Sequence, residues 1–177
     1  MSAVDFMKQT LEFIHRGFKG APAGLSDEQL HFVPEGQSHS IAWTMWHGAR
    51  IEDLFFQQLF QGKRPEWETG GWAEKTGLPA KGFGTGQSTE DASAIRIASL
   101  TDFQAYQAKL AELSSAFLDG IADADLAARE VKLGEKIETL GESINLHLVI
   151  HLNGHRGEIN LIRGMMGFDP VLLNQGG

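Results

Sequence analysis

The chain has 177 residues, of which 42% are hydrophobic and 21% charged, so one domain over residues 1–177 can bury a sizeable core. Its 15 lysines and arginines against 23 aspartates and glutamates give a net charge of −8. That balance argues against a nucleic-acid partner, because binding to phosphate backbones depends on clustered basic side chains. Cysteine is absent, which excludes disulfides, thiolate metal sites and a cysteine nucleophile. A transition metal would have to be held by imidazole, and the chain has seven histidines.

Neither membrane insertion nor secretion is expected. No apolar run approaches the ~20 residues that cross a bilayer. The first six residues contain no basic stretch followed by an apolar run, so they do not form a signal peptide. We therefore expect a soluble, cytoplasmic protein whose partner is a small-molecule substrate rather than a nucleic acid or a membrane.

The first expected helix covers residues 4–18, where apolar side chains recur at spacings of three and four and so share one helical face. They are Val4, Met7, Leu11, Ile14 and Phe18. Gly20 and Pro22 end this run. The capping-box pattern that begins at Ser26 predicts a further short helix.

A second long helix is expected to begin near Ser38 or Ser40 and to end near Gln61. Residues 62–100 follow as a long connection that contains seven glycines. Connections of that length inside a compact domain are usually functional or partly disordered.

The third expected helix runs from about Asp102 to Asp119, with a capping box at Thr101 and Gln104 and with Gly120 at its C-terminal cap. Its apolar seam is Phe103, Tyr106, Leu110, Leu113 and Phe117. Residues 121–138 have no clear pattern.

The fourth expected helix begins with a capping box at Thr139 and Glu142 and ends at Gly167. Its apolar face is Ile144, Leu148, Ile159, Ile162 and Met166, and its polar face is Asn145, Asn153, Arg156, Asn160 and Arg163. Four amphipathic helices without a convincing alternating strand predict an all-α protein, a four-helix bundle with a long crossover between its second and third helices.

Two histidines fall on the apolar stripe of this fourth helix. With Ile144 at zero and about 100° per residue, His151 lies at roughly −20° and His155 at roughly +20°, in the middle of the stripe. Side chains four residues apart are neighbours, so the pair can chelate one ion. The alternative is that each buried imidazole has a local hydrogen-bond partner, which is harder to arrange for two stacked rings. The pattern alone does not decide between these two alternatives.

His47 is the best candidate for a third ligand, because it lies beside the core-facing residues of the second helix. Three neutral imidazoles would make an open site for a divalent ion. His147 competes for this role, although its angle of roughly −60° places it at the margin of the stripe. Glu158, at roughly −40°, is the candidate catalytic residue, either beside the metal as a proton carrier or instead in a surface salt bridge. His39 is expected to be a loop residue.

Three other sequence patterns are weaker candidates for a metal or nucleotide site. The pairs Glu12–His15 and Glu28–His31 have the spacing found in di-iron bundles, but Glu12 points away from its apolar stripe and Glu28 lies near a loop. We expect both pairs on the surface. The glycine-rich segment 82–86 has no lysine at phosphate-loop spacing and no flanking strand, so nucleotide binding is not expected.

Two segments, residues 40–47 and 151–158, are similar to the DinB-like superfamily of YfiT-type, metal-dependent proteins. The resemblance implies an up-down-down-up bundle with a long crossover, which residues 62–100 would suit. It also implies that His47, His151 and His155 are the metal ligands. Where that family often has glutamine after an Arg–Gly pair, this chain has Glu158.

The resemblance further implies a metal-dependent enzyme that transfers a low-molecular-weight thiol to an electrophile, with zinc or nickel as the expected metal and a homodimer as the expected assembly. A thiol supplied by a cofactor suits a chain without cysteine. Two alternatives stay open: a non-catalytic bundle that binds a structural metal or another ligand, and an interaction module whose buried histidines bind no metal. A structural zinc site usually has four ligands, so His147 or Glu158 in the shell would favour the first alternative.

Overall fold

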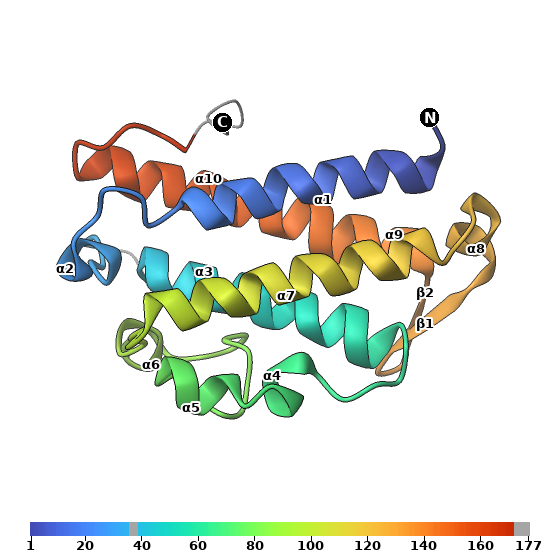
Figure 1. The fold of residues 1–177 in the computed structure, drawn as a ribbon, viewed down its shortest axis with the longest axis horizontal. Helices are drawn as coiled ribbons and strands as arrows, with labels where there is room; N and C mark the ends of the chain where they lie inside the picture. The colour runs from blue at the N-terminus through green and yellow to red at the C-terminus, as the bar shows by residue number, and fades with distance from the viewer. Residues whose placement is uncertain (36–38, 172–177) are drawn as a thin grey trace.

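Four long helical rods form the frame of the protein in the computed structural model, which describes residues 1–35 and 39–171 (Figure 1). Two rods are single helices, and the other two each contain a π-helical segment. We call α3 with η1 the second rod, and α9, η2 and α10 together the C-terminal rod. The helices are α1 (Ala3–Gly20), α3 (Ile41–Asp53), η1 (Leu54–Leu59), α7 (Leu100–Asp119), α9 (Leu140–Ile144), η2 (Asn145–Ile150) and α10 (His151–Met165).

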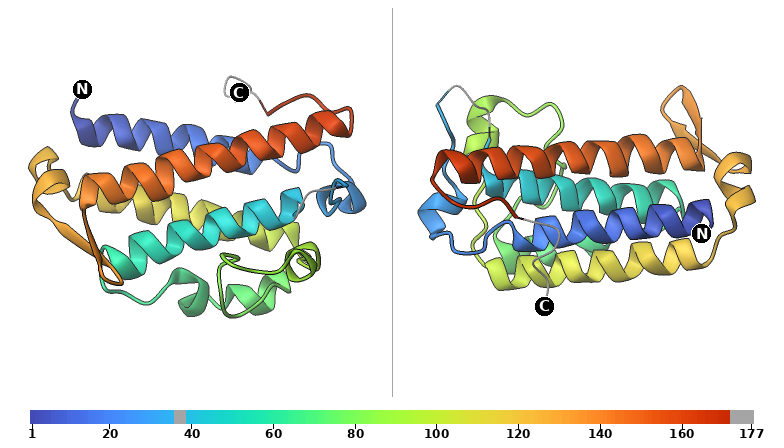
Figure 2. Two further views of the ribbon diagram at one scale, coloured as in Figure 1. Left: turned by 180° about the vertical axis from the view of Figure 1, so that it is seen from behind. Right: turned by 90° about the horizontal axis from the view of Figure 1, so that it is seen from above.

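The rods lie side by side, and each contacts two neighbours. Helix α1 packs against α7 and the C-terminal rod, and α3 packs against the same two rods from the other side. The chain passes along α1 and the C-terminal rod in one direction and along α3 and α7 in the other (Figures 1 and 2). No described helix is both long and apolar enough to cross a membrane.

The N-terminal helices form as the sequence predicts. Ser2 caps α1, and Asp5 completes a capping box. Ser26 and Gln29 cap the short helix α2 (Asp27–Leu30) in the same way. Of the expected stripe on α1, four residues are buried and Met7 is partly buried.

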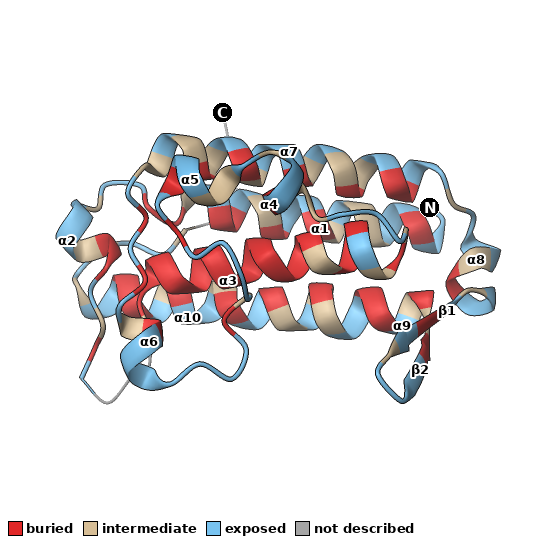
Figure 3. Ribbon diagram, turned by 90° about the horizontal axis from the view of Figure 1, so that it is seen from below, coloured by how far each residue is buried: buried red, intermediate tan, exposed pale blue. Residues whose placement is uncertain are grey.

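Ser40 caps the second rod, because its hydroxyl accepts a hydrogen bond from the Trp43 amide. Ser38, the other predicted start, lies outside the described residues. Every residue of α3 is buried, including its polar ones. The reason is that the crossover covers the face of α3 that points away from the other rods (Figure 3).

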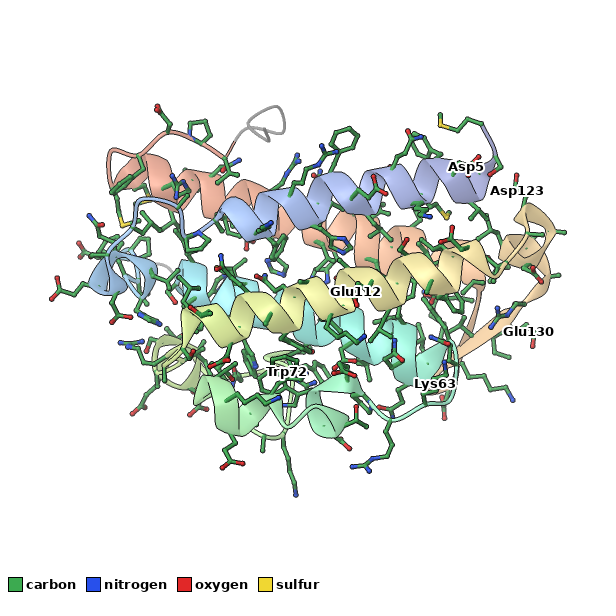
Figure 4. The ribbon with its side chains drawn as sticks, in the orientation of Figure 1. Asp5, Lys63, Trp72, Glu112, Asp123 and Glu130 are labelled. Atoms are coloured by element: carbon green, nitrogen blue, oxygen red, sulfur yellow. The ribbon has the colours of Figure 1, made fainter. Side chains whose placement is uncertain are left out.

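The crossover contains three short helices: α4 (Glu66–Thr69), α5 (Trp72–Thr76) and α6 (Thr89–Ser93). Asp53 fastens its first part to α3, because its carboxylate accepts hydrogen bonds from the amides of Glu66 and Trp67 and from the Tyr106 hydroxyl. Trp72 points from α5 toward α7 and packs on the same tyrosine at 5.7 Å between ring centroids (Figure 4). These contacts hold the crossover against both α3 and α7.

Helix α7 begins earlier than predicted. Ser99, and not Thr101, is its N-cap, with the Ser99 hydroxyl accepting from the Asp102 amide. Ser114 occupies a buried position while Leu113 is only partly buried, because the serine hydroxyl is satisfied by the Leu110 carbonyl at 2.9 Å.

Residues 121–138, left without a predicted structure, form α8 (Asp123–Ala128) and a hairpin of β1 (Glu130–Leu133) and β2 (Lys136–Thr139). The protein is therefore mostly helical, consistent with the all-α expectation, and its small two-stranded sheet lies in the segment for which the sequence predicted no structure. Gly134, at φ 65°, begins the two-residue turn between the strands. Asp123 accepts hydrogen bonds from the first amides of α1, beside Asp5 in Figure 4.

The C-terminal rod begins at the predicted capping box of Thr139 and Glu142. Its π-helical segment, η2, holds more residues per turn than an α-helix, so angles calculated at about 100° per residue do not carry across it. As a result Leu152 is buried in the core, whereas His151 is half-buried. The prediction that His151 lies in the middle of the core stripe is therefore wrong. Arg163, predicted on the polar face, is buried and donates to the carbonyls of Ala21 and Ala23.

Candidate metal centre

Three imidazoles from two rods meet at one point between α3 and α10. The Nε2 atom of His151 lies 3.3 Å from that of His47 and 2.9 Å from that of His155. The ring centroids of His47 and His155 are 5.0 Å apart. His47 and His155 are buried and His151 is half-buried. The structure thus brings together the three histidines that the sequence analysis selected, although they come from positions 104 residues apart.

The other nitrogen of each ring faces a hydrogen-bond acceptor. His47 Nδ1 faces the Phe83 carbonyl, His151 Nδ1 faces the His147 carbonyl at 3.3 Å, and His155 Nδ1 faces a carboxylate oxygen of Glu158 at 2.6 Å. Carbonyl and carboxylate oxygens only accept, so each neutral ring carries its proton on Nδ1. Each Nε2 atom then directs an unprotonated lone pair at the common point. The three Nε2 atoms therefore cannot donate hydrogen bonds to one another.

This donor set suits a divalent metal. Zinc–nitrogen bonds of ~2.0–2.1 Å in a tetrahedral shell put two ligand nitrogens roughly 3.3 Å apart. The observed Nε2 separations of 2.9 and 3.3 Å are close to that value. Three converging lone pairs, each oriented by an acceptor on the far nitrogen, form the arrangement found around metal-binding imidazoles.

The surroundings favour the neutral form of two of the rings. Burial, together with the neighbouring histidines and against the hydrogen bond to Phe83, lowers the pKa of His47 to about 4. Burial also lowers the pKa of His151. The hydrogen bonds from His155 and His39 hold the pKa of Glu158 well below its usual range. At neutral pH the site therefore offers the uncharged imidazoles of His47 and His151 and the carboxylate of Glu158.

The crossover reaches the centre through its backbone. Arg50 donates two hydrogen bonds to the Gly82 carbonyl, at 3.1 and 3.3 Å, and the next carbonyl is the acceptor for His47. Gly84 has φ 93°, and a Cβ there would lie 2.9 Å from Trp43 and 3.0 Å from His47 Nδ1. Only glycine allows the chain so close to these rings. Sequence reasoning considered this segment only as a phosphate loop and missed its role beside the histidines.

His39 is a loop residue, as expected, but it is not remote. Its ring lies 4.2 Å from that of Trp43, and its Nε2 is 3.4 Å from the Glu158 carboxylate. His39, His155 and Glu158 form a second group of close ligand atoms that shares His155 with the first. Glu158 is half-exposed, with its carboxylate held between two imidazoles.

His147, the competing ligand, points elsewhere. Its Nε2 lies 3.0 Å from a carboxylate oxygen of Glu138, and its ring stacks on Phe55 at 4.8 Å. It contributes its backbone carbonyl to His151 but not its side chain to the centre. Among the described residues, the close ligand groups contain neither His147 nor Glu138.

The two ExxH pairs do not form a metal site, but the expectation that both lie on the surface is wrong for their histidines. His31 is buried, with hydrogen bonds to the Asp27 carbonyl and from the Ile97 amide. His15 is partly buried and bonds to Glu52 at 2.9 Å. The glutamates of both pairs, Glu12 and Glu28, are exposed.

Comparison with known proteins identifies the class to which this fold and centre belong. Residues 11–159 match the sequence profile of the DinB superfamily, which is well over half of the chain, so the protein belongs to that superfamily. Among solved structures, a conserved protein from Enterococcus faecalis is similar, with a TM-score of 0.76 and 24% identity over 94% of this chain and 99% of that chain. At that identity the likeness shows the fold alone. Comparison with curated proteins gives no match.

Proposed function

We propose that the protein is a metal-dependent enzyme whose divalent ion is held by His47, His151 and His155. The observation that carries the proposal is the convergence of three Nε2 atoms. Those of His47 and His155 lie within 3.3 Å of the Nε2 atom of His151, and each ring has a hydrogen-bond acceptor at its Nδ1 atom. Membership of a superfamily that often binds metal supports it. Zinc and nickel are the metals that we propose, since imidazole ligands suit both.

The reaction class that we propose is transfer of a small thiol to an electrophilic substrate. A divalent ion held by neutral imidazoles supplies a full double positive charge, which favours the deprotonated form of a small thiol. In the reaction the thiol loses its proton to solvent, its sulfur forms the new bond to the electrophile, and the leaving group departs with its electron pair. Because the chain has no cysteine, the thiol must come from a separate molecule.

We propose that Glu158 orients the His155 ligand and does not hold the thiol proton, because its pKa lies well below its usual range. Its carboxylate accepts the His155 Nδ1 proton at 2.6 Å and is half-exposed, so it both orients a ligand and reaches solvent. Trp43 stacks on His47 at 4.7 Å and shields the centre on that side. Together these two side chains hold the rings of His155 and His47 away from the common point and leave their Nε2 atoms available to bind an ion.

Metal content is the first test. The untagged protein should contain, or take up, about one zinc or nickel ion per chain. His155→Ala should abolish uptake while the helical spectrum stays unchanged, and His147→Ala, a histidine on the same rod that faces Glu138, should leave uptake intact. Uptake below about a fifth of an ion per chain by the unaltered protein would rule out the metal site.

Activity is the second test. The metal-loaded protein is incubated with a panel of low-molecular-weight thiols and a generic aromatic electrophile, and product is followed by mass. We expect turnover that disappears on metal removal and in His155→Ala. Stoichiometric metal without any metal-dependent turnover would favour the second candidate, a non-catalytic bundle that binds a metal or another ligand. That candidate has one supporting observation, the second ligand group of His39, His155 and Glu158, which offers a place for an ion on the Nδ1 side of His155.

Three further points are proposals. The directions of the rods in Figure 1 support the up-down-down-up bundle of the superfamily. A homodimer is supported by four large apolar side chains on the outer face of the C-terminal rod, each at least 43% exposed: Leu146, Ile150, Leu161 and Met165. Sedimentation should show a dimer that Ile150→Glu dissociates. The cytoplasmic location stays a proposal, which cell fractionation would test.

A further inference from the structure

A second group of ligand atoms lies on the far side of the His155 ring. The Nε2 atom of this ring lies 2.9 Å from that of His151 in the centre, whereas its Nδ1 atom faces a carboxylate oxygen of Glu158 at 2.6 Å. The Nε2 atom of His39 lies 3.4 Å from the same oxygen. Ligand atoms of His39, His155 and Glu158 all lie within 4.8 Å of one another. The two groups therefore share a single imidazole.

The three side chains of this second group come from two segments. His39 belongs to the loop before α3, where its ring packs on Trp43 with 4.2 Å between the ring centroids. His155 and Glu158 are three residues apart on α10, so they are neighbours on one helical face. The side chains of Glu158 and His39 are 47% and 22% exposed, against 11% for His155. An ion can therefore reach this group from solvent while the shared ring stays inside.

The donor set of the second group suits a divalent metal. Two imidazoles and one carboxylate are a ligand set of open zinc sites. The His39 contact of 3.4 Å is close to the ~3.3 Å expected between two ligands of one tetrahedral ion. The His155 contact of 2.6 Å is shorter, so the half-exposed carboxylate has to turn outward to admit the ion.

We propose that a second divalent ion binds to His39, His155 and Glu158, and that the deprotonated His155 ring bridges it to the first ion. The bridge rests on the proposed function, because that function supplies the ion at Nε2. When the second ion binds, the Nδ1 proton leaves to solvent and the nitrogen lone pair forms the bond to the metal. Two ions on one ring repel each other, so we expect the second to bind about 10- to 100-fold more weakly than the first.

Zinc stoichiometry tests the second site without any assay of activity. The metal-depleted full chain is titrated with zinc by calorimetry, and the bound ions are counted by native mass spectrometry. We expect two ions with unequal affinities. His39→Ala, a change outside the described helices, should bind one ion and keep its helical spectrum. His147→Ala, which removes a side chain that faces Glu138, is the matched control and should bind two.

Two further measurements address the carboxylate and the shared ring. Glu158→Gln removes the only charged ligand of the second group, so the second ion should be lost while the first stays bound at reduced affinity. Copper(II) reports on the ring, because two copper ions joined by one imidazolate couple magnetically. The EPR signal of the protein with two coppers should be weaker than that of two isolated ions, and a full signal would overturn the bridge.

The failure of the second site can be told apart from the failure of the proposed function. One ion in both the unaltered protein and His39→Ala would overturn the second site and leave the proposed function intact. A single ion whose affinity falls in His39→Ala would overturn it too, because that ion would lie at one shared position. No ion in the unaltered protein would contradict the proposed function as well.

Discussion

Glu158 contacts the candidate centre through one imidazole nitrogen, and this contact can be tested alone. Its carboxylate oxygen lies 2.6 Å from His155 Nδ1. Glu158→Gln keeps an acceptor of the same size but removes the negative charge that makes the ring a better ligand. Partners of this kind usually contribute about 10- to 100-fold in metal affinity. We therefore expect zinc affinity, measured by competition with a chelator, to fall by about 10-fold.

The matched control is Glu12→Gln, an exposed glutamate on α1. It changes the net charge equally but does not belong to the ligand groups among the described residues. Equal metal affinity in both variants would show that Glu158 acts only through overall charge.

His15 should make stability depend on pH. Burial lowers the pKa of His15, but the charge of Glu52 and the hydrogen bond to it outweigh this effect and raise the pKa above its usual value. A raised pKa means that the folded state holds the proton more tightly than the unfolded state. The stabilisation is then complete below the unfolded pKa of about 6.5 and is lost as pH rises through the folded value.

We expect the free energy of unfolding of the metal-depleted protein, measured in urea, to decrease as pH rises above about 6.5. In Glu52→Gln this decrease should be smaller, because the partner that raises the pKa is gone. Glu28→Gln, an exposed residue, should behave like the unaltered protein. The same pH dependence in Glu52→Gln would contradict the assignment.

The residues of the centre were predictable only in part. The four-residue spacing of His151 and His155 on an apolar helix indicated a chelating pair, and His47 followed from its place beside the core. The acceptors for their far nitrogens were not all predictable. The Phe83 and His147 acceptors are backbone carbonyls, which every residue has, so no sequence pattern distinguishes them. Only Glu158 left a signal in the sequence.

Two glycines of the crossover share a positive φ but differ in the space around a Cβ atom, so their alanine variants should differ. Gly84 and Gly86 both have positive φ, 93° and 76°. A Cβ at Gly84 would lie 2.9 Å from Trp43, whereas at Gly86 nothing lies within 4 Å. Gly86→Ala should therefore cost only the backbone strain of about 1–2 kcal/mol. Gly84→Ala should cost more and should also weaken metal binding, because it displaces the acceptor of His47.

Chelator competition for metal affinity and urea unfolding for stability would measure both effects. If the two alanine variants proved equal in metal affinity, the crossover would have no part in orienting His47.

The helices with strong periodicity and capping boxes were predicted well, and the elements that were missed have physical reasons. The hairpin is short, and its pattern around Gly134 is too brief to separate from a loop. The π-helical segments η1 and η2 were missed because a periodicity of about 3.6 residues per turn was assumed throughout both rods. The burial of Arg163 depends on carbonyls at the end of α1, which lie 140 and 142 residues away in the sequence.

The centre joins parts of the chain that are distant in sequence, so the metal should stabilise the whole protein. His47 and His151 are 104 residues apart, and the unfolded chain does not bring them together. A ligand that binds only the folded state adds about 2.7 kcal/mol at a concentration 100 times its dissociation constant. For a protein of this length that corresponds to a rise in Tm of roughly 5–11 °C.

Calorimetry with and without zinc would measure this rise, and His155→Ala should show none of it. A similar shift in that variant would mean that zinc acts elsewhere on the protein.

The crossover reaches the histidines through the carbonyl oxygens of Gly82 and Phe83, and its Gln87 side chain accepts a hydrogen bond from the Trp43 indole at 2.8 Å. A contact through a carbonyl oxygen does not depend on residue identity, except where a Cβ would collide with a neighbour, as at Gly84. The exposed side chain at position 85 can therefore be exchanged during evolution or randomised in a directed library while the imidazole geometry is kept, whereas Phe83 packs against the core. If the proposed function holds, substrate preference in this scaffold can diversify separately from the histidine centre.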